Sequence, residues 1–172
     1  MDNEIQKRNV RLVKVDRKNF DSLVDLTPDE AGRHYVADNI YSLAEAYANL
    51  ADGNKVQPFG IYDGDTPVGF VMIGYDIIDE NDDLDKQYFI KDCYLVWRFM
   101  IDEKYQHKGY GKEGLKLALD YIRTFPFGKA EYCWLSYEPE NDRARKLYQS
   151  FGFIEEKEMP EGWDEIPAVL KL

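Results

Sequence analysis

Cysteine, long apolar runs and positive charge are all scarce in this chain, and each shortage excludes a class of protein. The 172 residues contain two cysteines, Cys93 and Cys133, and neither has a partner at the spacing of metal ligands. Neither a disulfide framework nor a zinc site is therefore predicted. No run approaches the ~18 apolar residues of a membrane span, and the first residues, MDNEIQKRNV, lack the apolar centre of a signal peptide. We expect a cytoplasmic protein with no membrane partner.

The charge balance is strongly acidic. Asp and Glu together number 33 against 22 Lys and Arg, which gives a formal net charge of -11. Such a surface repels the phosphates of nucleic acids and anionic lipids, and it attracts cations. The sequence therefore predicts no nucleic-acid partner and favours a cationic substrate.

Apolar and aromatic residues are plentiful. They make up 44% and 15% of the chain, which is enough for the core of one domain and too little for two. The chain contains no internal repeat and no low-complexity segment. We expect a single domain over residues 1–172.

The N-terminal region alternates patterns of strand and helix. β-branched and leucine residues alternate with charged ones over residues 10–16, which predicts a strand. A helix is predicted over residues 20–26 from the spacing of its apolar residues. Thr27, Pro28 and Glu30 form a capping-box pattern, so a further helix is predicted to begin at Thr27.

A longer helix is predicted from Asn39 up to the sequence ADGN. Apolar residues recur there at helical spacing, at Ile40, Leu43, Ala44, Tyr47 and Leu50. The two β-rich runs of residues 58–78 surround Asp63-Gly64-Asp65, which indicates a hairpin. Residues 76–87 form an acidic loop, and residues 88–101 are predicted to form a third long strand.

The C-terminal half continues with one helix, one strand, one helix and two strands. These are predicted over residues 111–124, 130–137, 141–150, 153–157 and 166–170. The order of elements, with three antiparallel strands before a single βα crossover, is that of an α+β fold rather than of repeated βαβ units.

A glycine-rich loop, QHKGYGKEG at residues 106–114, lies between the third strand and the next helix. A strand-to-helix loop leaves main-chain N–H groups without partners, and glycines let the main chain approach a ligand closely. Lys108 and Lys112 add positive charge to the positive end of the helix dipole. The loop is therefore predicted to bind an anionic group such as a phosphate.

Two common phosphate-binding patterns fit this loop poorly. In the P-loop pattern the first glycine lies five residues before the second, but Gly109 lies only two residues before Gly111. In addition, no Ser or Thr follows Lys112. The dinucleotide pattern G-x-G-x-x-G is met by Gly109, Gly111 and Gly114, and Glu138 lies near the expected distance downstream. However, the seven residues DEKYQHK separate the strand from the first glycine, and the preceding strands form a meander. A nicotinamide or flavin oxidoreductase is an alternative on that pattern.

A third pattern, Q/R-x-x-G-x-G/A after a strand, is met by residues 106–111. A second motif, N-x-x-A-x-x-x-Y-x-x-x-G-F, is met by residues 141–153. With both motifs, the chain resembles the GNAT N-acetyltransferase superfamily over essentially its full length. The segments HYVADNIYSLAEAY and PFGIYDGDTPVGFVMIGYD resemble the spermine/spermidine or diamine branch. The resemblance implies a mixed sheet of about six or seven strands, with a splayed parallel pair, flanked by about four helices.

The resemblance also implies a cofactor, acetyl-CoA, and the residues that bind it. The strand before the loop would pair its main chain with the pantetheine arm at Phe99, Met100 and Ile101. The loop would hold the diphosphate with Gln106, His107, Lys108, Gly109, Tyr110, Gly111 and Lys112. Asn141 is an N-cap by its position and would also contact the arm, while Arg143 and Lys146 would reach the phosphates.

Tyr148 is implied to be the general acid that protonates the departing thiolate. The strand before the loop offers no matching carboxylate base, because Trp97 and Arg98 stand where some polyamine enzymes carry a glutamate. Glu138, at the end of the next strand, is our candidate, acting directly or through a water molecule, with Asp92 as another. Desolvation of the amine alone is a further alternative. We expect both histidines to be non-catalytic.

A polyamine site needs carboxylates and aromatic walls. Our candidates for substrate binding are Tyr35, Asp38, Tyr41, Glu45 and Asp76. The predicted function is transfer of an acetyl group from acetyl-CoA to a primary amine of a small cationic acceptor, most simply a polyamine. The alternatives are a non-catalytic acyl-CoA sensor and an enzyme for aminoglycosides or for protein lysines or N-termini. A homodimer is expected from the resemblance only, through the C-terminal strands.

Overall fold

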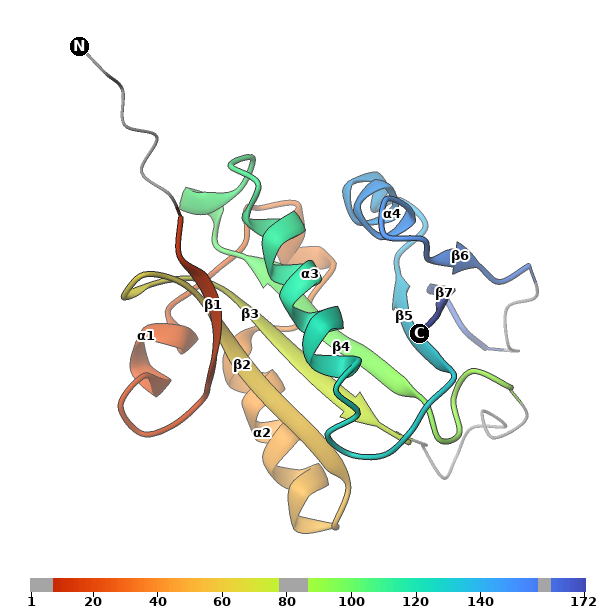
Figure 1. Cartoon of the computed structure of the whole chain (residues 1–172). Helices are drawn as coiled ribbons and strands as arrows, with labels where there is room; N and C mark the ends of the chain where they lie inside the picture. The colour runs from red at the N-terminus through yellow and green to blue at the C-terminus, as the bar shows by residue number, and fades with distance from the viewer. Residues whose placement is uncertain (1–7, 78–86, 158–161) are drawn as a thin grey trace.

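A computed structural model describes residues 8–77, 87–157 and 162–172, and these residues form one mixed sheet with helices on both faces (Figure 1). The strands run in the order β1-β2-β3-β4-β5-β7-β6 across the sheet. Their bounds are β1 (Val10–Lys14), β2 (Lys55–Asp63), β3 (Thr66–Tyr75), β4 (Tyr94–Ile101), β5 (Tyr132–Tyr137), β6 (Ile154–Glu155) and β7 (Ile166–Lys171). The α-helices are α1 (Phe20–Val24), α2 (Asn39–Ala51), α3 (Tyr110–Ile122) and α4 (Asp142–Gln149).

The predicted α+β fold is confirmed. Strands β1 to β4 form an antiparallel meander, α3 makes the crossover, and β4 and β5 are parallel. The parallel pair is splayed, because β4 and β5 pair only at Tyr94 with Cys133 and at Leu95 with Trp134. Beyond Leu95 the two strands diverge, which opens the sheet at its centre.

Helix α3 covers one face of the sheet, and α1 and α2 cover the other (Figure 1). On the first face Leu115, Leu119 and Ile122 are buried against the strands. Gly114 lets α3 come close, since a Cβ atom there would lie 2.8 Å from Cδ1 of Ile61. The position of α3 fixes the loop at its N-terminus relative to β4.

A β-bulge interrupts β4 next to the opening. Met72 pairs with Arg98 but the next residue of β3, Ile73, pairs with Val96, so Trp97 is the extra residue. Such a bulge bends a strand and increases its twist. The bulge therefore turns the second half of β4 away from β5.

The predicted helix at Thr27 is wrong. The N–H of Thr27 donates to the carboxylate of buried Asp102 at 3.1 Å, and residues 26–29 are irregular before a turn leads into a 3₁₀ helix at Gly32–His34. A buried carboxylate from a distant loop thus outcompetes the local capping box, in which the side chain of Thr27 would accept from its own helix.

Two predicted strands are shorter than expected. Residues 88–92 form turns, with Phe89 and Ile90 buried, and β4 begins only at Tyr94. The strand predicted over residues 153–157 shrinks to β6. Most of the predicted acidic loop, residues 78–86, lies outside the described residues. Within the described residues, none of the helices has the length and apolar character that crossing a membrane requires.

Candidate active site

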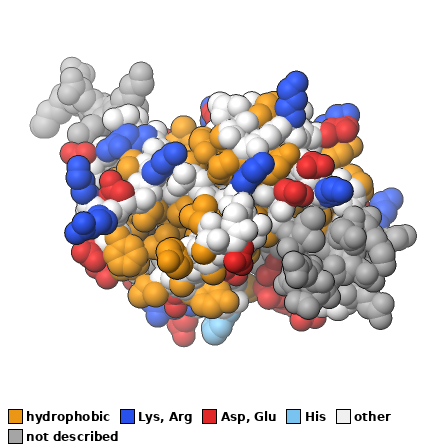
Figure 2. Space-filling model, turned by 90° about the horizontal axis from the view of Figure 1, so that it is seen from below, with side chains coloured by type: hydrophobic (Ala, Val, Ile, Leu, Met, Phe, Trp, Pro, Cys, Tyr) orange, Lys and Arg blue, Asp and Glu red, His pale blue; other side chains and the backbone are white. Residues whose placement is uncertain are grey.

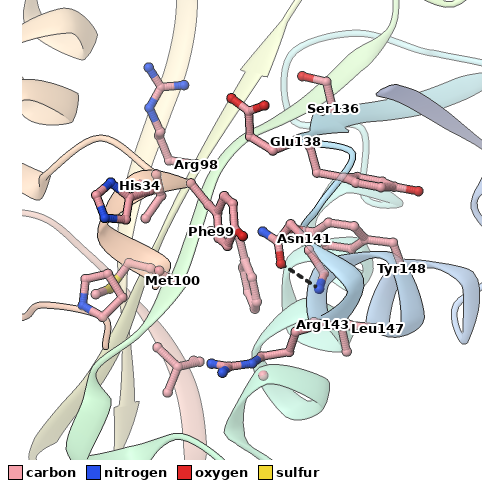
Figure 3. Close-up of a pocket in the computed structure, with 18 of the residues that line it drawn as sticks. His34, Arg98, Phe99, Met100, Ser136, Glu138, Asn141, Arg143, Leu147 and Tyr148 are labelled. Carbon is pink, nitrogen blue, oxygen red and sulfur yellow. Dashed lines mark hydrogen bonds between the residues drawn. The ribbon is translucent and has the colours of Figure 1, made fainter. Parts of the chain in front are cut away.

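A cavity of about 1060 Å³ lies where β4 and β5 diverge. Its walls come from residues 28–37 between α1 and α2, from β4, from the loop before α3, from the end of β5 and the start of α4, and from residues 163–165. Figure 3 shows side chains of β4, such as Phe99 and Arg98, on one side and Glu138, Asn141 and Tyr148 on the other. The sequence therefore brings both predicted motifs to one cavity.

The wall formed by β4 has a free strand edge. Phe99, Met100 and Ile101 all line the cavity, as predicted, and β4 pairs with β3 on its other side. Because the ladder to β5 stops at Leu95, the main-chain groups of β4 that point toward β5 are open to an extended ligand. The carbonyl of Ile101 is an exception, since Nε2 of Gln106 donates to it at 3.0 Å.

The loop before α3 presents unpaired N–H groups. The main-chain N–H groups of residues 107–111 donate to none of the residues that the structure describes. His107 has a φ of 59° and Gly109, the N-cap of α3, has a φ of 90°, with no side chain capping the helix. Positive φ values of this kind turn successive N–H groups into a concave anion site at the positive end of the helix.

Arg143 reaches from the first turn of α4 across to this loop. Its Nη1 donates to Oε1 of Gln106 at 2.7 Å, and its Nη2 lies 3.0 Å from Oδ2 of Asp29. Burial opposes ionisation of Asp29, but the N–H of Gly32 and the Arg143 guanidinium outweigh it and keep the pKa of that carboxyl below its usual range. Arg143 thus places a guanidinium beside the anion site.

The other predicted cofactor residues divide into two groups. Side chains or main chain of seven of them line the cavity, at Gln106, His107, Gly109, Gly111, Lys112, Asn141 and Arg143. Lys108 lies outside the lining, with Nζ donating to the carbonyl of Lys104 at 2.6 Å. Tyr110 packs in the core, donates to Asp63 at 2.7 Å and also lies outside the lining. Lys146 also lies outside the lining.

Helix α4 positions Asn141 and Tyr148. Oδ1 of Asn141 accepts from the N–H of Ala144 at 3.1 Å, which is the predicted N-cap. The Tyr148 ring packs between Tyr137 and Phe153, with ring centroids 5.6 and 6.0 Å away. Burial, followed by the charges of Tyr137 and Glu165, raises the pKa of Tyr148 well above its usual range. A phenol is protonated at neutral pH even at its ordinary pKa of about 10, so Tyr148 holds a proton that it can donate.

The wall opposite β4 is acidic. Glu138 at the end of β5 lies beside three other carboxylates that line the cavity, Glu140, Asp164 and Glu165. Desolvation raises the pKa of Glu138, and the charges of Glu165, Glu140 and Asp164 raise it further. Trp134 and Trp163 stack 5.8 Å apart on the same side. We call the four carboxylates of Glu138, Glu140, Asp164 and Glu165 the acidic wall.

Sequence reasoning found Glu138 but missed the rest of the acidic wall. Glu165 and Asp164 reach the site because β7 pairs with β5, where Ser136 lies opposite Pro167 and its Oγ donates to Glu165. Nothing local in the sequence marks this contact. The acidic composition and the tryptophan within EGWDE are the signals that could have suggested it.

Most of the predicted substrate residues lie outside the cavity lining. Tyr35 is part of the lining, whereas Asp38 caps α2 by accepting from the N–H of Tyr41 at 2.7 Å, and Tyr41 is exposed. Asp76 has a positive φ and accepts from the N–H of Asp92 at 2.9 Å. These carboxylates therefore hold main-chain turns, which is what short acidic side chains do at caps and tight turns.

Glu45 has a different partner. Its carboxylate lies 2.9 Å from Nη2 of Arg98, and both side chains are mostly buried. Arg98 lines the cavity, and its buried Nε has no hydrogen-bond partner among the described residues. Glu45 thus neutralises Arg98, which lies on β4 where some polyamine enzymes carry a catalytic glutamate.

Comparisons with known proteins identify the family of the chain. The chain matches the Acetyltransferase (GNAT) family over residues 21–153. It is 31% identical to the spermine/spermidine N(1)-acetyltransferase of Bacillus subtilis (strain 168) over 147 residues, which cover 84% of this chain and 86% of the relative.

Two solved structures share the fold. One is a spermidine N-acetyltransferase from Vibrio cholerae in complex with CoA and spermine, with a TM-score of 0.63, 19% identity, and coverage of 94% of this chain and 95% of the other. The second is an aminoglycoside acetyltransferase in complex with coenzyme A and kanamycin, with a TM-score of 0.74, 14% identity and 95% coverage of both chains. This chain belongs to the GNAT acetyltransferase family and is an N-acetyltransferase that depends on acetyl-CoA.

Proposed function

We propose that this enzyme acetylates a primary amine of a polyamine such as spermidine, spermine or a diamine. The observation that carries the proposal is the acidic wall, which sets four carboxylates and two tryptophan rings around one side of the cavity. Ammonium groups pair with carboxylates and lie over aromatic faces, and a polyamine carries several of them along a flexible chain. The Bacillus subtilis relative, which is named a spermine/spermidine acetyltransferase, supports the same acceptor.

The described residues fit acetyl-CoA, which supplies an activated acetyl thioester when bound. The unpaired N–H groups of residues 107–111 would hold its diphosphate, with Lys112 and Arg143 beside them. The free edge of β4 at residues 99–101 would pair with the pantetheine arm, with Asn141 facing it from α4. We further propose that residues 1–172 form the single domain that carries this site.

Two residues would move protons. The ammonium group would first lose one proton to solvent, and Glu138, whose pKa is raised, would accept the second proton from the neutral amine as it attacks, directly or through water. The amine nitrogen then bonds to the acetyl carbon, the carbon–sulfur bond breaks, and Oη of Tyr148 would give its proton to the departing sulfur.

A thiol-release assay with acetyl-CoA tests the acceptor. The panel contains spermine, spermidine, diamines, kanamycin and lysine-bearing peptides. We expect the highest kcat/KM with the polyamines, because they alone carry several ammonium groups on a chain thin enough to follow the acidic wall. A higher kcat/KM with kanamycin or with a peptide would overturn the polyamine assignment.

The pH profile gives a second prediction. Replacing Glu140 by glutamine removes one of the negative charges that raise the pKa of Glu138. The pKa of Glu138 then falls, its carboxylate form persists to lower pH, and the acidic limb of the kcat/KM profile moves to lower pH. Glu131→Gln, at a distant surface carboxylate paired with Lys171, is the control and should leave the limb in place. An unmoved limb in Glu140→Gln would remove Glu138 as the base.

The third prediction concerns Arg143. Arg143→Gln should raise the Kd for coenzyme A about tenfold, because a charged hydrogen bond to phosphate is lost while Asp29 regains water. Isothermal titration with coenzyme A measures this without turnover. Lys146→Gln removes the same charge from the same helix outside the cavity lining and should change the Kd much less. Equal effects of the two variants would mean that Arg143 acts only through long-range charge.

A further inference from the structure

One ion pair of this protein lies within the cavity. On the face of the molecule in Figure 2, acidic and basic side chains are interspersed around an apolar area. Other ion pairs of the described residues, such as Lys116 with Asp120, have at least one partner outside the cavity lining. Arg143 and Asp29 are the only pair among these residues of which both partners line the cavity. A ligand in the cavity can therefore compete with this pair.

The carboxylate of Asp29 is held in place by its own turn. Asp29 lies in residues 28–37, the segment between α1 and α2 that forms one side of the cavity. Its Oδ1 accepts from the N–H of Gly32 at 3.0 Å. The turn is tight, since a Cβ atom at Gly32 would lie 2.9 Å from the same oxygen. The local main chain thus fixes one oxygen of Asp29 and leaves Oδ2 for Arg143.

Arg143 makes two contacts and has further donors. Figure 3 shows its side chain extending from α4 toward the side of the cavity formed by β4. A guanidinium has five N–H donors in a planar fork. In Arg143, Nη1 donates to Gln106 at 2.7 Å and Nη2 pairs with Asp29 at 3.0 Å. The side chain of Arg143 is 56% exposed, so a phosphate can reach the guanidinium.

A diphosphate in the loop before α3 would meet this pair. The unpaired N–H groups of residues 107–111 begin next to Gln106, which is bonded to Arg143. Arginine binds phosphate best with two parallel N–H groups of its fork. One Nη group of Arg143 is taken by Asp29, and the carboxylate of Asp29 would also repel a phosphate beside it. Asp29 and the diphosphate are therefore competitors for one cation.

We propose that Asp29 competes with the diphosphate of the cofactor for Arg143 and thereby weakens cofactor binding. Asp29 is in this sense a positioning residue, which acts on the cofactor through Arg143. The inference rests on the proposed function, which sets the diphosphate beside Arg143. When a phosphate takes the guanidinium, the ion pair that joins residues 28–37 to α4 opens.

Such a competitor matters for turnover. Coenzyme A has to leave after every transfer, and product release limits kcat in many enzymes. The carboxylate of Asp29 is held by its turn next to the guanidinium, so it can take the place of the phosphate as the product leaves. Asp29 is therefore expected to raise the dissociation rate of coenzyme A.

Isothermal titration of the full chain with coenzyme A tests the proposal. Asp29→Asn should lower the Kd about threefold, because an ion pair at this exposure is worth about two- to fivefold in an equilibrium constant. Asparagine keeps an oxygen for the N–H of Gly32, so the turn and the midpoint of thermal unfolding should be preserved. The matched control is Glu30→Gln, which removes the same charge from the next residue, an exposed side chain outside the lining. The control should change the Kd less.

A double-mutant cycle shows whether Arg143 carries the effect. In a chain with Arg143→Gln, adding Asp29→Asn should change the Kd no more than adding Glu30→Gln does. The proposal is overturned if Asp29→Asn raises the Kd or lowers it only as much as Glu30→Gln. It is also overturned if Asp29→Asn lowers the Kd equally with and without Arg143.

The same titrations separate this proposal from the proposed function. They contain no acceptor, so a wrong polyamine assignment does not alter them. If Arg143→Gln leaves the Kd unchanged, the diphosphate does not lie beside Arg143, and both the cofactor placement and the competition are wrong. If Arg143→Gln raises the Kd and Asp29→Asn does not lower it, the placement stands and only the competition is wrong.

Discussion

Replacing Tyr148 by phenylalanine is expected to lower kcat by about 10²–10⁴-fold, the range of a lost general acid, while the Kd for coenzyme A stays the same. The phenol of Tyr148 is protonated at neutral pH, and the residue lines the cavity from α4. The substitution removes the proton donor and leaves the ring in place. Thiol release measures kcat, and calorimetry measures the Kd.

The stability of this variant separates a catalytic role from a structural one. The hydroxyl of Tyr148 makes no hydrogen bond to the described residues, so its loss should leave the free energy of unfolding unchanged. The neighbouring Tyr137 is the matched control, because its hydroxyl donates to Oε1 of Glu155 at 2.6 Å. Tyr137→Phe should therefore cost about 1–3 kcal/mol of stability and little kcat. An unaltered kcat in Tyr148→Phe would exclude this phenol as the acid.

The elements that were predicted correctly are those with short-range signals. The glycine loop and α4 are specified by residues within about a dozen positions of one another, and an N-cap or a left-handed glycine acts within one turn. Asn141 and Gly109 consequently have the local roles that their motifs imply. The hairpin of β2 and β3 turns at Gly64, as the DGD sequence predicts.

The elements that were missed depend on distant parts of the chain. Thr27 does not cap a helix, because Asp102 takes its N–H. Helical spacing predicted α2 with its correct start, but it could not tell which side of the helix packs, since Ile40 and Tyr47 point away from the sheet. Both outcomes were set by tertiary contacts that a local pattern does not contain.

The same reason explains why most of the predicted substrate residues do not line the cavity. Asp38 and Glu45 were predicted from the helical region that roofs the acceptor site in the GNAT fold, yet Asp38 caps α2 and Glu45 neutralises Arg98. The acidic wall is assembled by the pairing of β5 with β7, two strands separated by α4 and β6 in the chain. Only the register of that pair brings Glu165 beside Glu138.

The acidic wall carries the remaining large effect that we expect. In the double variant Glu138→Gln and Glu165→Gln, kcat/KM for spermine should fall by at least about 100-fold, since each half-buried carboxylate contributes about tenfold through a charged contact with an ammonium group and Glu138 is also the proposed base. These two are the less exposed members of the wall, so water screens them least. The KM for acetyl-CoA should stay the same, because the loop and β4 are untouched.

The control must remove the same charge without touching the cavity. Glu131→Gln with Asp65→Asn does so, because both carboxylates lie on the surface outside the lining and pair with Lys171 and Arg11.

If the control lowers kcat/KM for spermine as much as the wall variant does, the polyamine is attracted by the overall electrostatic field of the protein and not by the acidic wall. If the wall variant also loses activity equally toward a monoamine, the loss lies in Glu138 as the base. A loss that grows with the number of ammonium groups on the acceptor, from monoamine to diamine to spermine, is the result that the geometry of the wall requires.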